Sequence, residues 1–96
     1  MSQAKADPWL TTEEISAEVG VSKATLWRWA RLGVLPEPTL VHMGRRGRHA
    51  RWPLHTPEQA RWVLGLLERG WTFEEIRAAL ERGEFAPRTS GSEDSR

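Results

Sequence analysis

Residues 20–36, GVSKATLWRWARLGVLP, carry more structural information than any other part of the chain. Gly20 can adopt positive φ in a tight turn, and Ser22 is a candidate N-cap for the helix that follows. Helix-permissive residues then continue until a glycine and a proline stop them. The stretch therefore predicts one short helix, from about Lys23 to Leu32.

The two sides of this predicted helix differ in chemistry. Its apolar side consists of Leu26, Trp29 and Ala30. Its opposite side consists of Ala24, Arg28 and Arg31. A helix that is anchored by one apolar side and presents arginine on the other suits the major groove of DNA, where guanidinium groups reach guanine edges or phosphates. We therefore interpret it as a recognition helix.

An earlier helix is predicted over Thr11 to Val19. Thr11 and Glu14 match the capping box, in which a hydroxyl and a carboxylate satisfy each other's free backbone donors. Ile15 and Val19 would face the core, and Gly20 would end the helix. Only residues 20–22 separate it from the next helix, which is the short glycine-containing connection of a helix-turn-helix.

The stretch from Val34 to His55 is predicted to be non-helical. Residues 39–42 are β-prone, residues 44–47 can turn the chain, and residues 48–52 can return as a second strand. This pattern indicates a β-hairpin with an arginine-rich tip. Because an isolated hairpin is marginally stable, we expect it to pack on the helices through Leu40 and Trp52.

Two further helices are predicted after the hairpin. The third begins with Thr56 as cap, Pro57 at the first helical position and Gln59 closing a capping box, and it ends at Gly70. Its expected core residues are Ala60, Val63, Leu66 and Leu67. The fourth is expected to run from a Thr72 cap, with Glu75 closing the box, to Gly83; its apolar stripe is Phe73, Ile76 and Leu80. The predicted fold is a mostly α winged helix-turn-helix, with four helices and a two-stranded β-hairpin wing between the second and third helices.

Length and composition are those of one small domain. The 96 residues include no cysteine, which excludes disulfides, cysteine-based metal sites and thiol nucleophiles. We expect a flexible N-terminus at 1–8, the domain at 9–85 and a disordered tail at 86–96. No apolar stretch has membrane-spanning length and the N-terminus lacks a signal peptide pattern, so we expect a cytoplasmic, nucleoid-associated protein. A piece of a larger protein is the alternative.

Positive charge is concentrated in the middle of the chain. Residues 23–52 carry seven Lys or Arg residues and a single acid, Glu37, whereas both flanking segments carry an excess of acids. A solvated surface usually mixes the two signs. This distribution favours a surface that binds a polyanion.

Residues 9–83 resemble the DNA-binding domain of the MerR family of bacterial regulators. The resemblance lies in Leu10-Thr11 with Ile15, Gly20-Val21-Ser22, Thr25-Leu26 with Trp29, Leu32 to Pro36, Arg51-Trp52, and Leu66 with Gly70 to Ile76. It implies a winged helix-turn-helix that binds double-stranded DNA. The chain departs from the family at Trp27, where an arginine is common, and in lacking the heptads of a dimerising coiled coil after Gly83. No effector-binding domain is visible.

The residues expected to bind DNA lie on the recognition helix and the hairpin. They are Lys23, Thr25, Trp27, Arg28, Arg31, Arg45, Arg46, Arg48 and Arg51. Trp27 could stack on the DNA backbone or pack on the wing, and both readings stay open. The run Arg46-Gly47-Arg48 resembles sequences that read narrow minor grooves, although phosphate contact is the simpler reading.

Other site chemistry finds little support in the sequence. The three histidines, His42, His49 and His55, lack metal-ligand spacing, so we expect no metal, and no cofactor motif is present. The paired glutamates at 13–14 and 74–75 fit helix N-termini better than catalysis. Trp29, Trp52 and Trp71 are expected in the core, whereas Trp62 lies off its helix's apolar stripe and is a candidate contact for a protein partner.

The favoured function is a small prokaryotic transcriptional regulator that binds double-stranded DNA. One alternative is a phage- or plasmid-type architectural factor, such as an excisionase or a packaging or partition adaptor. Another is a protein-interaction module that keeps the fold, and homo-oligomerisation stays open. No membrane partner and no enzymatic activity are expected.

Overall fold

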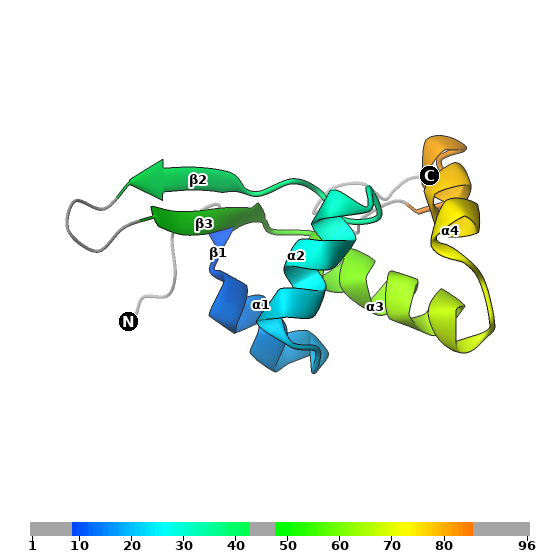
Figure 1. Ribbon diagram of the computed structural model, residues 1–96, viewed down its shortest axis with the longest axis horizontal. Helices are drawn as coiled ribbons and strands as arrows, with labels where there is room; N and C mark the ends of the chain where they lie inside the picture. Colours follow the sequence, from blue (N-terminus) through cyan, green and yellow to red (C-terminus); the bar gives the residue numbers. More distant parts are fainter. Residues whose placement is uncertain (1–8, 43–47, 86–96) are drawn as a thin grey trace, which may run out of the picture.

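The computed structural model describes residues 9–42 and 48–85 and has the winged helix-turn-helix architecture predicted from the sequence (Figure 1). The elements in chain order are β1 (Trp9–Leu10), α1 (Thr12–Val19), α2 (Lys23–Arg31), β2 (Thr39–His42), β3 (Arg48–Pro53), α3 (Thr56–Glu68) and α4 (Phe73–Glu81). The expectations for residues 1–8 and 86–96 lie outside the described residues.

Local capping sets the start of three helices, as the sequence predicts. In α1 the amide of Thr11 donates to Glu14 Oε1 at 2.8 Å and the amide of Glu14 donates to Thr11 Oγ1 at 3.1 Å. The same reciprocal pair joins Thr72 and Glu75 at the start of α4. Ser22 caps α2 by accepting from the Thr25 amide at 3.1 Å. These bonds satisfy amide donors that have no partner within a helix.

The predicted capping box of α3 is wrong. The helix begins at Thr56 itself, and His55 stands at the N-cap position with no side-chain cap bond. The Thr56 side chain is fully buried, and Gln59 donates instead to the carbonyl oxygen of Val34 at 2.9 Å. Tertiary packing buries Thr56 and a tertiary hydrogen bond engages Gln59, so neither residue takes part in the predicted capping box.

The wing hairpin is present and belongs to a three-stranded antiparallel sheet of order β1-β3-β2. The sequence did not reveal β1, because two residues are too short for an alternating pattern to be visible. In the hairpin Leu40 pairs with Ala50 and Thr39 pairs with Arg51. Since directly paired residues and residues two apart share a face, Leu40, Ala50 and Trp52 lie on one side, and Thr39 and Arg51 lie on the other.

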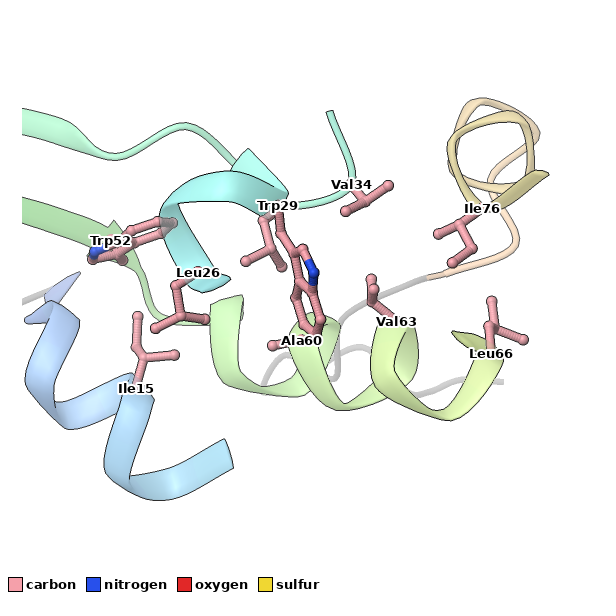
Figure 2. Close-up of a cluster of buried hydrophobic side chains, with 10 residues drawn as sticks. Ile15, Leu26, Trp29, Val34, Trp52, Ala60, Val63, Leu66 and Ile76 are labelled. Carbon is pink, nitrogen blue, oxygen red and sulfur yellow. The ribbon is translucent and has the colours of Figure 1, made fainter. Parts of the chain in front are cut away.

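One hydrophobic core joins the helices to the sheet. Figure 2 shows the buried side chains as one band, from Ile15 and Trp52 at one end to Leu66 and Ile76 at the other. Trp52 is fully buried, and its Nε1 donates to Thr12 Oγ1 at 2.8 Å. Trp29 is also buried, so two of the three tryptophans expected in the core lie there, and Trp71 packs against the core with partial exposure.

Leu40 does not anchor the hairpin as predicted, because 47% of its surface is exposed. The hairpin projects away from the helices, as Figure 1 shows. Leu40 stands on the helix-facing side of the sheet but farther along the hairpin than Trp52, whose partner across the sheet is Leu10. The wing is therefore held to the helices mainly through Trp52.

Among the described residues, no helix combines the length and apolar character that crossing a membrane requires.

Candidate nucleic-acid interface

The two sides of α2 are separated in the structure as the helical wheel predicts. Leu26 is fully buried and Trp29 is 4% exposed, whereas Ala24, Arg28 and Arg31 are exposed. The buried pair fixes the helix on the core. The arginines are therefore presented outward from a rigid element, which is the arrangement that a recognition helix requires.

Arg28 and Arg31 have no ion-pair partner among the residues that the structure describes. Three other described cations are paired: Lys23 with Glu13, Arg61 with Glu18 and Arg82 with Glu84. Both arginines lie in the last turns of α2, where a positive charge interacts favourably with the helix dipole. Two guanidinium groups without a carboxylate partner are available to an external anion or base edge.

Trp27 links the recognition helix to the wing. Its ring meets the Trp52 ring edge-to-face, with centroids 5.4 Å apart and an interplanar angle of 64°. The structure thus shows Trp27 packed on the wing, and its contact with DNA stays a prediction. Aromatic pairs of this geometry add to the stability of the contact beyond simple burial. The pair thus helps set the orientation of the hairpin relative to α2.

Thr25 is engaged within its own helix start. Its amide donates to Ser22 Oγ, and the two hydroxyl oxygens lie 2.9 Å apart. The residue is half-buried. This geometry shows a role in forming the turn.

A cleft of about 430 Å³ opens between α2 and the wing. It is lined by Thr11, Thr12, Glu13, Lys23, Trp27, Leu40, His49 and Ala50. The Lys23 ammonium lies 3.4 Å from the Glu13 carboxylate across the helix-turn-helix. A hydrogen bond with its own backbone lowers the pKa of Glu13, and so do the hydrogen bond and the charge of Lys23, with a smaller effect from His49.

Sequence reasoning missed Glu13 as part of this face, because a helix N-terminus already explains the paired glutamates at 13–14. The sequence also gives no sign that His49 lies beside Glu13 at the cleft. Nothing in the local pattern joins them, because α1, α2 and β3 meet at the cleft only after folding. The ten-residue separation of Glu13 and Lys23 across the turn was the one available signal.

Among the wing arginines, the structure describes the side chain of Arg51. Arg51 stacks over the Trp9 ring at 4.7 Å, on the sheet face opposite Trp52, so the structure does not bring it together with Arg28 and Arg31. Arg48 lies at the start of β3, where it pairs with His42. Arg45 and Arg46 lie outside the described residues.

Two other expectations concern residues away from this face. Trp62 is half-buried and contacts the Phe85 ring, with centroids 5.3 Å apart, so part of its surface is covered by this chain. Its role in a protein contact stays a prediction. In the part of the chain that the structure describes, no three His, Asp or Glu side chains are grouped to hold a metal ion.

Comparison with known proteins identifies the class of this fold. Residues 9–55 match the family model described as a helix-turn-helix domain. Neither the curated proteins nor the solved structures contain a significant match. The matched range runs from β1 to the residue before α3 and so includes α2, the cleft and the wing. This match supports a helix-turn-helix domain that binds DNA.

Proposed function

We propose that the chain is a small MerR-like prokaryotic transcriptional regulator that binds double-stranded DNA. In this proposal α2 enters the major groove and the wing lies over the adjacent backbone or minor groove. The helix-turn-helix match and the concentration of basic residues between 23 and 52 support DNA as the partner. The motifs shared with the MerR family, including the capped helix after Gly70, support the narrower assignment.

The observation that carries the proposal is the state of Arg28 and Arg31. Both are exposed on the outer side of a helix whose inner side is buried, and neither is paired with a described carboxylate. A guanidinium fork can donate to O6 and N7 of guanine in the major groove. The same groups can bind phosphate, so the experiment has to separate base readout from backbone contact.

Selection of bound sequences from a random duplex pool tests the proposal. The wild-type protein is expected to enrich a motif, and Arg28→Ala and Arg31→Ala are expected to lose preference at one or two positions each. A guanine contact corresponds to about 1–3 kcal/mol of discrimination. Arg61→Ala is the matched control, because Arg61 is also exposed but lies on α3 and pairs with Glu18.

The outcomes separate the possible roles. Uniform weakening without loss of base preference would make the two arginines phosphate contacts. Absence of binding to any duplex at low salt would contradict the proposed function and favour a protein-interaction module. A single module buries only about 600–1,000 Å² on DNA, which limits its affinity for one site. Side-by-side footprints of several copies on repeated half-sites would favour the architectural, excisionase-type role.

A further inference from the structure

The cleft between α2 and the wing combines an apolar floor with a charged rim. Trp27, Leu40 and Ala50 supply the apolar surface, and Lys23 and Glu13 supply opposite charges. Leu40 is one of the two large hydrophobic side chains that stand exposed among the described residues. A DNA backbone offers the matching chemistry, since it alternates apolar sugar faces with anionic phosphates.

A phosphate could replace the Glu13 carboxylate as the partner of the Lys23 ammonium. The carboxylate accepts from the Lys23 ammonium at 3.4 Å, and the two side chains are 71% and 57% exposed. A carboxylate and a phosphate are both anionic oxygen acceptors for an ammonium. An exposed ion pair of this kind is weak, so Lys23 can exchange its partner readily.

We propose that this cleft is a subsite for one DNA backbone phosphate and that Glu13 occupies the phosphate's place in the free protein. The proposal rests on the DNA-binding function proposed above. It assigns Lys23 as the ligand of the phosphate, and Trp27 and Leu40 as the surface against which the neighbouring sugar lies. It also assigns Glu13 a role that opposes binding.

This arrangement makes a counter-intuitive prediction about affinity. When DNA binds, the phosphate takes Lys23 from Glu13 and comes to lie beside a second negative charge. Glu13 therefore lowers the affinity for DNA of any sequence. In the wild-type complex the Glu13 carboxylate that Lys23 has left takes up a cation, which offsets one of the cations released from DNA. Removal of the Glu13 charge therefore steepens the dependence of affinity on salt.

Fluorescence anisotropy with a labelled duplex, measured over a range of KCl concentrations, tests the subsite. Glu13→Gln is expected to tighten binding roughly three- to tenfold at low salt and to steepen the log–log salt slope by about one. Glu18→Gln is the matched control: it removes the same charge from the same helix, but Glu18 pairs with Arg61 on α3. It is expected to change affinity less than about twofold, as a general charge effect.

Lys23→Met separates a local effect from a general one. In this background Glu13→Gln is expected to have no larger effect than Glu18→Gln, because no ammonium remains to be released. An equal effect of the two glutamine variants in the wild-type background would overturn the subsite, and so would a Glu13→Gln effect undiminished by Lys23→Met. Weaker binding by Glu13→Gln would overturn it in favour of a direct contact from Glu13 to DNA.

The outcomes also separate this inference from the function on which it rests. A wild-type protein that binds DNA while Glu13→Gln behaves as Glu18→Gln overturns the subsite alone. A wild-type protein that fails to bind any duplex overturns both. Thermal unfolding of each variant checks that the fold is retained, and both glutamates are exposed enough for glutamine to be tolerated.

Discussion

Thr56 and Thr12 are buried residues of the same type in opposite situations. The Thr12 hydroxyl accepts a hydrogen bond from Trp52 Nε1 at 2.8 Å. The Thr56 hydroxyl has no partner among the described groups, although its side chain is fully buried. A buried polar group without a partner loses its bonds to water and gains nothing in return. Replacing each threonine by valine is therefore expected to change the free energy of unfolding in opposite directions.

Thr56→Val is expected to raise the free energy of unfolding by about 1 kcal/mol, because it replaces an unsatisfied hydroxyl with a methyl group of similar size. For a domain of this length that corresponds to roughly 4–8 °C in Tm. Thr12→Val is expected to lower stability by about 1–3 kcal/mol, since it leaves the indole donor unsatisfied. Thermal and urea unfolding measure both, and a destabilised Thr56→Val protein would show that the hydroxyl has a partner.

Glu13 is expected to titrate below an isolated glutamate. Its pKa is lowered by its backbone hydrogen bond first and by Lys23 second. The folded-state pKa lies below the unfolded one, so the stabilisation is present above the unfolded value and is lost as pH falls through the folded value. NMR titration of the side-chain carboxyl carbon measures this pKa. In Lys23→Met it is expected to rise only part of the way, because the backbone bond remains.

At the scale of elements, the end of α2 is fixed by local backbone geometry and by a contact from α4. Gly33 has φ of +85°, and the Val34 amide donates to the Trp29 carbonyl oxygen at 3.1 Å to close the helix. A Cβ on Gly33 would lie 2.8 Å from Cδ of Arg77. Glycine is thus favoured there by its left-handed conformation, and any side chain at this position would also displace the exposed Arg77 side chain.

Gly33→Ala and Gly70→Ala separate these two reasons. Gly70 has φ of +95° with nothing near its missing Cβ, so its substitution is expected to cost only the conformational strain, about 1–2 kcal/mol. Gly33→Ala is expected to cost more, because the Arg77 side chain must also move. Urea unfolding measures the difference. In an Arg77→Ala background the two substitutions are expected to converge, and equal costs in the wild-type background would show that Arg77 yields freely.

At the scale of the whole molecule, three elements meet on the face that we propose for DNA. Figure 1 shows α2 lying between the projecting hairpin and the α3–α4 pair. The Trp27–Trp52 contact and the bond from Trp52 to Thr12 couple α2, β3 and α1. The wing is therefore oriented by the core, and its position relative to α2 does not depend on its own marginal stability.

The salt dependence of DNA affinity reports how much of this face is used. If four to six cations of α2 and the wing engage phosphates, the slope of log affinity against log salt is expected to be about −4 to −5. Anisotropy titrations over a range of KCl concentrations give the slope. A nearly flat response would show that the wing does not contact the backbone.

The sequence predicted well those features that depend on residues close together in the chain. The capping boxes of α1 and α4, the Ser22 cap and the buried side of α2 are confirmed, because each joins residues one helical turn apart. The start of α3 was wrong because Gln59 bonds to a carbonyl 25 residues away. The prediction that Leu40 packs on the helices was wrong for a similar reason. A strand pattern shows which face of the sheet a residue lies on, but not how far the helices extend over that face.

The candidate site was predictable only in part. Arg28 and Arg31 follow from helical periodicity, which is a local property, and the structure leaves both exposed. The stacking of Arg51 on Trp9 and the pairing of Glu13 with Lys23 depend on a two-residue strand and on the packing of α1 beside α2. No local pattern encodes such contacts.

By itself, the amino-acid sequence determined the helix-turn-helix, the hairpin and the arginine side of the recognition helix, because caps, turns and periodicity act over a few residues. Only the tertiary structure decided which charges remain free and which are paired. That outcome depends on distances between side chains far apart in the chain, which are fixed when the common core around Trp52 forms.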